Sequence, residues 1–125
     1  MNAATAAILL WTSMTTAPTL EGKATYYDEG IMQRVIANRG WDYADGVALN
    51  RAGDLGRTVW LLWEDGTIDG PLPVVDCAQR DHYRTREDQS RVVEVSAELA
   101  QKRGFYGVGP VPVTVLFHEP MEGWE

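Results

Sequence analysis

Short runs of apolar and β-branched residues, separated by glycine, proline and acidic residues, set the pattern of this chain. Runs of this kind are typical of β-strands. They predict strands at residues 22–28, 46–50, 57–63, 72–77, 92–95 and 111–117, with a hairpin turn at 64–67. Many short strands with little helix predict a small, closed β-barrel.

Two segments depart from the strand pattern. Residues 97–103 predict a short helix, because Ser96 is a favourable N-cap, cations fill the last turn and Gly104 follows it. Residues 31–38 carry apolar side chains at a spacing that fits one helical turn or an irregular loop, and Gly40 ends this segment.

Each of two valine-rich runs contains one carboxylate: Asp76 follows Val74-Val75, and Glu94 follows Val92-Val93. Strands of this kind are at least half buried, so a carboxylate there is paired, hydrogen-bonded or kept protonated. On neighbouring strands the two form a candidate acid/base site. The alternative is that both side chains point outward into solvent. The polar loop 78–90 connects the two strands and brings further binding groups beside them.

The composition is that of one globular domain, with 125 residues of which 45% are hydrophobic and 23% charged. The net charge of −7 opposes binding to nucleic acid and to anionic membranes, and leaves neutral polymers such as polysaccharides as partners. Cys77 is the single cysteine, either a buried inert thiol or a nucleophile. His82 and His118 lie far apart without ligand spacing around them, so we expect no metal site.

The beginning and end of the chain differ from the rest. Residues 1–20 contain an apolar run without a preceding cation, too short to cross a bilayer. We expect an ordered N-terminal extension that packs on the domain or on a neighbour, giving self-association, with a signal-peptide remnant as the alternative. The barrel domain then covers residues 21–118, and an acidic tail covers 119–125.

Several segments, taken in order, carry a resemblance to a known family. They are Gly22-Lys23-Ala24-Thr25-Tyr26-Tyr27, Arg34-Val35-Ile36-Ala37-Asn38, Asp54-Leu55-Gly56-Arg57-Thr58-Val59, Val74-Val75-Asp76, Val93-Glu94-Val95-Ser96 and Gly109-Pro110-Val111-Pro112-Val113. They resemble, in the same order, the strand and turn motifs of the rare lipoprotein A family, whose barrel is shared with expansins. The resemblance implies a mostly β fold, a six-stranded double-psi β-barrel with one or two short helices.

The family includes lytic transglycosylases that cut peptidoglycan, expansins that loosen cellulose walls without hydrolysis, and related glycoside hydrolases. The resemblance implies Asp76 as the general acid, Glu94 at the second acidic position and Thr25 as a polar binding residue, with no cofactor. A lytic transglycosylase needs one acid/base carboxylate, whereas a hydrolase needs a second one to direct water. We further expect the substrate to be bound by Tyr27, Asn38, His82 and Tyr83.

Three features depart from the family pattern. Cys77-Ala78-Gln79 replaces its Arg-Gly-Pro, Glu94 replaces its aspartate, and no wall-binding repeat accompanies the barrel. Two hypotheses therefore stand. In the first, the protein is a lytic transglycosylase-like or expansin-like protein acting on peptidoglycan or a related wall glycan, in an extracellular, periplasmic or cell-envelope location. In the second, it is a non-catalytic glycan-binding or structural barrel of an extracellular or virion assembly.

The geometry of the carboxylates separates these hypotheses. The enzyme hypothesis requires Asp76 and Glu94 to share an open groove with Thr25. It also requires carboxyl carbons roughly 5–9.5 Å apart, as in glycosidase pairs.

Overall fold

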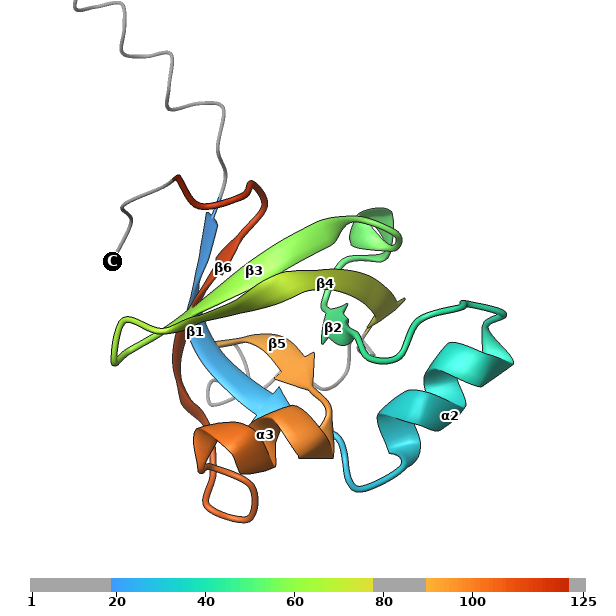
Figure 1. Cartoon of the computed structure of the whole chain (residues 1–125), viewed down its shortest axis with the longest axis horizontal. Helices are drawn as coiled ribbons and strands as arrows, with labels where there is room; N and C mark the ends of the chain where they lie inside the picture. The colour runs from blue at the N-terminus through green and yellow to red at the C-terminus, as the bar shows by residue number, and fades with distance from the viewer. Residues whose placement is uncertain (1–18, 78–89, 122–125) are drawn as a thin grey trace, which may run out of the picture.

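Six strands form a closed barrel in the computed structural model, which describes residues 19–77 and 90–121 (Figure 1). The strands are β1 (Thr19–Tyr26), β2 (Val47–Leu49), β3 (Thr58–Trp63), β4 (Ile68–Cys77), β5 (Arg91–Val95) and β6 (Val111–Leu116). Their order around the barrel is β1-β5-β2-β4-β3-β6. The predicted mostly β, six-stranded barrel is thus confirmed.

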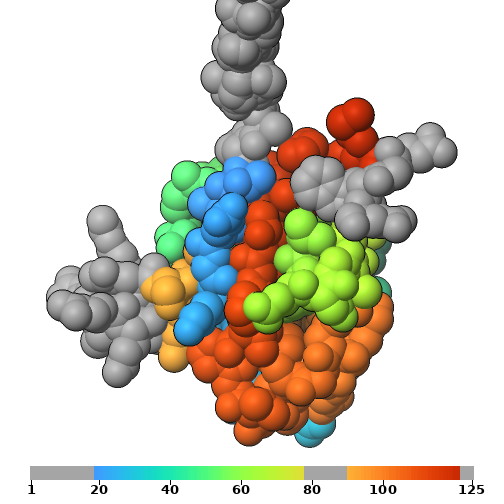
Figure 2. Space-filling view, turned by 90° about the vertical axis from the view of Figure 1, so that its left-hand side faces the viewer, coloured from blue at the N-terminus to red at the C-terminus, as the bar shows by residue number. Residues whose placement is uncertain are grey.

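Two of the strand pairs are parallel, namely β1 with β5 and β2 with β4, and the other four pairs are antiparallel. Figure 2 shows the face on which β1 and β6 run side by side, with β3 beyond β6. Because the barrel is closed, the described strands leave no free sheet edge. Each strand therefore presents one face to the interior and one to the outside.

The interior of the barrel is filled by alternate residues of the strands. On β3, for example, Val59, Leu61 and Trp63 are buried, whereas the residues between them are partly exposed. This period of two follows from the pleat of a strand. The same core takes in Phe105, which follows the second helix. The run Thr58–Trp63 is apolar from Val59 onward, so the sequence predicts the strand but not which of its side chains face inward.

Two short helices lie outside the barrel: α2 (Ile31–Asn38) and α3 (Ala97–Arg103), with a 3-10 turn η1 (Ala52–Asp54) before β3. The α3 helix begins and ends as predicted, since the Leu99 N–H donates to Ser96 Oγ at 3.2 Å and Gly104 adopts a left-handed φ of 82°. Residues 31–38 form a complete helix, where the sequence left one turn or an irregular loop open. The reason is that Met32 and Ile36 pack together on Val75 of β4.

Strand boundaries differ from the sequence-based expectation at two places. β4 begins at Ile68 rather than 72, and a shift in its register with β3 accommodates Gly70 and Pro71. Gly70 has a φ of 145°, and a Cβ there would lie 2.6 Å from Trp60 Cδ1, so the strand needs glycine at this position.

The second place is the start of β1. This strand begins at Thr19, which pairs with Leu116, so the barrel takes in two residues assigned to the N-terminal extension. Residues 1–18 and 122–125, including most of the extension and part of the acidic tail, lie outside the described residues. Within the described part, no helix is long and apolar enough to cross a membrane.

Candidate functional site

Asp76 and Glu94 lie on the two strands that flank β2. Ala48 of β2 is the register partner of both, Asp76 on β4 and Glu94 on β5. Directly paired residues point to the same face of a sheet, so the two carboxylates lie on one face. Two strand spacings of about 4.8 Å each place their Cα atoms roughly 10 Å apart. Thr25 extends this row, because it is the register partner of Glu94 on β1.

A bulge directs Asp76 away from the barrel interior. Val74 belongs to the interior core, and strict alternation would turn Asp76 to the same side. The register of β4 against β2 shifts at this point, so that Val75 is an extra residue without a partner. Val75 packs under α2, and Asp76 bonds to Arg39 just after this helix. Bulges commonly redirect a side chain in this way.

Thr25 and Tyr27, which lie two positions apart where β1 ends, each form a hydrogen bond with one of the two carboxylates. Thr25 Oγ1 donates a hydrogen bond to Glu94 Oε2 at 3.2 Å. The Tyr27 hydroxyl donates to Asp76 Oδ2 at 2.6 Å. The Tyr27 N–H donates to Val95 O at 2.9 Å, so the extended pairing with β5 continues to this residue. We call the side of the barrel wall that carries Thr25, Tyr27, Ala48, Asp76 and Glu94 the carboxylate face; Thr25 and Ala48 are buried in it.

Arg39 is a member of this site that the sequence analysis missed. Its Nε and Nη2 both donate to Asp76 Oδ1, at 3.1 and 2.8 Å. The side chain of Asp76 is 17% exposed and that of Arg39 is 43% exposed. Both oxygens of Asp76 therefore accept hydrogen bonds, and its charge is balanced by a guanidinium. Charge-assisted bonds of this kind are stronger than neutral ones, and here they fix the position of the carboxylate.

A hollow of about 280 Å³ opens beside Glu94. Its lining comes from β1, β5 and the segment before β6: Thr25, Tyr26, Arg91, Glu94, Gly109 and Pro110. Asp76 does not line it. The two carboxylates thus share a face, while this hollow lies on the Glu94 side of it.

Two aromatic residues follow Arg39. Trp41 Nε1 donates to the Val75 carbonyl at 3.0 Å, which fixes the indole beside the residue that precedes Asp76. The ring of Tyr43 lies 5.8 Å from that of Trp41, and Tyr43 is 46% exposed. The indole of Trp41 is partly buried against the cluster of Met32, Ile36 and Val75, and the ring of Tyr43 continues it toward solvent.

The remaining predicted site residues are placed as follows. Asn38 ends α2 and is exposed, and none of the hydrogen bonds of the described residues joins it to either carboxylate. His82 and Tyr83 lie outside the described residues. Cys77 ends β4 and is partly buried. In residues 19–77 and 90–121, no three His, Cys, Asp or Glu side chains form a group that would hold a metal ion.

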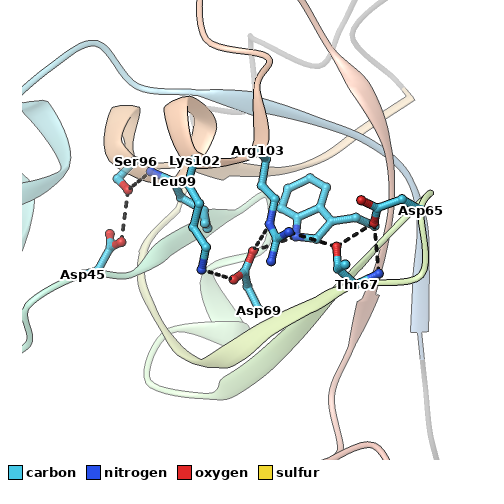
Figure 3. Close-up of polar contacts among 9 residues, drawn as sticks. Asp45, Asp65, Thr67, Asp69, Ser96, Leu99, Lys102 and Arg103 are labelled. Atoms are coloured by element: carbon cyan, nitrogen blue, oxygen red, sulfur yellow. Dashed lines mark hydrogen bonds and ion pairs between the residues drawn. The ribbon is translucent and has the colours of Figure 1, made fainter. Parts of the chain in front are cut away.

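A second charged cluster joins α3 to the β3–β4 hairpin (Figure 3). Asp69 accepts from Arg103 Nε at 2.7 Å, from Lys102 Nζ at 2.9 Å and from Trp63 Nε1 at 2.8 Å. Burial acts to raise the pKa of Asp69, but the hydrogen bonds from Arg103, Lys102 and Trp63 outweigh it and lower the pKa to about 2. These bonds attach α3 to the β3–β4 hairpin, so this cluster has a structural role.

Asp45 lies at the other end of the same helix (Figure 3). Its Oδ2 accepts from Ser96 Oγ at 3.1 Å, and its Oδ1 accepts from the Gly46 N–H at 2.8 Å. Burial raises the pKa of Asp45, although these two hydrogen bonds act in the opposite direction. Both ends of α3 are thus tied to the barrel through an aspartate.

Another hollow, of about 310 Å³, borders this structural cluster and contains none of the predicted site residues. Its lining is Trp63, Glu64, Asp65, Arg103, Phe105, Val111 and Pro112. Its cation, Arg103, is already bound to Asp69 and Thr67. We therefore take the carboxylate face, with its outward-facing polar groups, as the candidate functional site.

Comparison with known proteins supports the fold. The sequence matches no protein-family model and no curated protein. The structure is similar to the crystal structure of an apo expansin from Clavibacter michiganensis, with a TM-score of 0.52 and 17% sequence identity. The similarity covers 83% of this chain and 52% of that one, so the chain spans about half the length of its structural neighbour. The barrel therefore has the expansin-like double-psi fold.

Proposed function

We propose that this protein binds a cell-wall polysaccharide on its carboxylate face, in an extracellular, periplasmic or cell-envelope location. The observation that carries the proposal is that Thr25 and Tyr27 each fix one carboxylate on the same outer face. The resemblance of the sequence to the rare lipoprotein A and expansin families, and the expansin-like fold, support a wall glycan as the ligand.

The chemistry of the face suits a neutral polymer rich in hydroxyl groups. Carboxylates accept hydrogen bonds from sugar hydroxyls, and Arg39 donates to sugar oxygens. The side chains of Trp41 and Tyr43 add apolar ring surface beside these groups. A net charge of −7 opposes the approach of a polyanion. The partner that fits this face best is thus a polysaccharide without a high density of negative charge.

Cleavage as in a lytic transglycosylase is a second candidate, favoured by the position of two carboxylates on one face. That reaction needs a protonated acid aimed at the glycosidic oxygen. Asp76 is hydrogen-bonded to Arg39 and Tyr27 and does not line the hollow beside Glu94, which weighs against it as the acid that meets a bound glycosidic oxygen. Glycan binding without cleavage is therefore the function that we put first.

A sedimentation assay with insoluble cellulose, chitin and peptidoglycan tests the proposal. We expect the wild type to bind at least one of them, and Asp76→Asn and Glu94→Gln to bind more weakly. Asp42→Asn is the matched control, because Asp42 is exposed and makes none of the hydrogen bonds or ion pairs of the carboxylate face. Equal binding by all four proteins would contradict the proposal, and no binding at all would favour a structural barrel.

Release of anhydro-muropeptides from purified peptidoglycan tests the second candidate. Product from the wild type and none from Asp76→Asn would establish cleavage with Asp76 as the acid. Equal product from both would remove Asp76 from that role.

A further inference from the structure

The Arg39–Asp76 pair has hydrogen-bonding groups that none of the described residues uses. An ionised carboxylate accepts about four hydrogen bonds, and Arg39 and Tyr27 supply three of them to Asp76. A guanidinium carries five N–H donors, of which two from Arg39 donate to Asp76. Among the described residues, the pair thus keeps one acceptor position on Asp76 Oδ2 and three donors on a partly exposed guanidinium.

The pair is held rigidly from both sides. Arg39 caps α2, with its N–H donating to the Val35 carbonyl at 3.0 Å. The helix itself is anchored by Ile36, which packs on Val75 beside Asp76. Asp76 is in turn fixed by Tyr27. A rigid donor next to a rigid acceptor loses little entropy when a ligand binds.

The pattern of a free acceptor beside free donors matches two adjacent hydroxyls of a sugar ring. One hydroxyl donates to the carboxylate, and its neighbour accepts from the guanidinium. We propose that Arg39 and Asp76 together bind a pair of adjacent sugar hydroxyls, so that the role of Asp76 is recognition. This inference rests on the proposed glycan-binding function and names the ligand class more narrowly.

The indole of Trp41 gives independent support for a sugar at this place. It is bonded to Val75, the residue before Asp76, and it lies two positions after Arg39. Tyr43 extends the ring surface toward solvent. Within this proposal, the apolar C–H groups of the bound pyranose pack against the exposed part of these rings.

Two classes of wall glycan differ in whether their rings offer such a pair of hydroxyls. Chains of (1→4)-linked glucose keep two adjacent free hydroxyls on every internal ring. Chains of N-acetylglucosamine carry an acetamido group at one of these positions, so their internal rings have no such pair. The Arg39–Asp76 pair should therefore prefer the glucose chain.

Calorimetric titration with cellohexaose and chitohexaose tests this preference. We expect the wild type to bind cellohexaose at least ten-fold more tightly. Arg39→Gln should weaken cellohexaose binding about ten-fold, the effect expected for losing a hydrogen bond to a charged group, and should leave chitohexaose binding unchanged. Arg39→Lys keeps the charge but not the planar donor fork, so it should remain weakened.

Arg34→Gln is the matched control, since Arg34 is an exposed arginine of the same helix without a bond to the carboxylate face. It should bind like the wild type, and thermal unfolding should show that all variants are folded. Two results would overturn this inference and leave the proposed function standing. One is binding that is lost in Asp76→Asn but unchanged in Arg39→Gln, and the other is equal affinity of the wild type for the two sugars. Failure of the wild type to bind either sugar or any insoluble glycan would overturn both.

Discussion

Acid should weaken the attachment of α3 to the barrel, because Asp69 is its central acceptor. The pKa of Asp69 is lowered from 3.8 to about 2 in the folded protein. A carboxyl with a lowered folded-state pKa stabilises the protein above its unfolded pKa, and this contribution is lost as the pH falls through the folded pKa. The contribution of Asp69 is therefore complete above about pH 5 and is lost between about pH 4 and pH 2.

The size of the effect follows from the shift. A change from 3.8 to about 2 corresponds to roughly 2–3 kcal/mol at about 1.4 kcal/mol per pH unit. The side chain of Asp69 is only 10% exposed, but that of Lys102 is 61% exposed, and solvent screens its part of the interaction. We therefore expect about 1–2 kcal/mol of unfolding free energy to depend on the ionisation of Asp69.

Urea denaturation of the wild type and Asp69→Asn at several pH values measures this contribution. At pH 7 the variant should be less stable by about 1–2 kcal/mol, and the difference should shrink steadily below pH 4. Asp42→Asn is the control, because Asp42 is an exposed carboxylate outside this cluster. A difference between wild type and Asp69→Asn that stays constant from pH 7 to pH 2 would show that the ionised form of Asp69 does not stabilise the fold.

Three further predictions concern stability. Burial raises the folded-state pKa of Asp45, so its charge costs stability as the pH rises above about 4. In urea titrations, Asp45→Asn should therefore gain stability relative to wild type between pH 3 and pH 7. A stability difference that does not change over this range would contradict the prediction. Gly70→Ala should lower the unfolding free energy by about 2 kcal/mol or more, because its Cβ would meet Trp60 at 2.6 Å. Gly66→Ala, with a φ of 89° and open space around it, should cost only about 1 kcal/mol, and equal thermal shifts for the two would count against the clash. Val75→Ala should cost about 2 kcal/mol and speed amide hydrogen exchange in α2, since Val75 is the contact of this helix with β4; unchanged exchange would show that the helix is held elsewhere.

Local signals in the sequence account for the parts of the fold that were predicted well. Ser96 and Gly104 mark the ends of α3 because their caps involve residues close in the chain. The apolar run that marks β3 is equally local, whereas the choice of the side chains that face inward is not visible in it. The second turn of α2 was not foreseen, because what stabilises it is the contact of Met32 and Ile36 with a strand that comes about forty residues later.

In the candidate site, too, local signals indicate some features and distant contacts determine the others. The valine-rich runs point to Asp76 and Glu94, but the direction of Asp76 depends on the bulge at Val75, which exists only through pairing with β2. Arg39 is 37 positions away from Asp76 in the chain, and no motif links the two. The roles predicted for Asn38, His82 and Tyr83 remain predictions.

The position of β1 between β5 and β6 has a consequence for how the protein is made. Thr19 pairs with Leu116, and Thr25 pairs with Glu94, so the first strand finds both partners in the last third of the chain. During synthesis, β1 leaves the ribosome before β5 and β6 have been made, and its backbone N–H and C=O groups have no strand to pair with. Pairings so distant in sequence make folding slow, because the loop they close is long. The barrel can close only after residue 116 has emerged, and until then the unpaired edges of its first strands are open to aggregation.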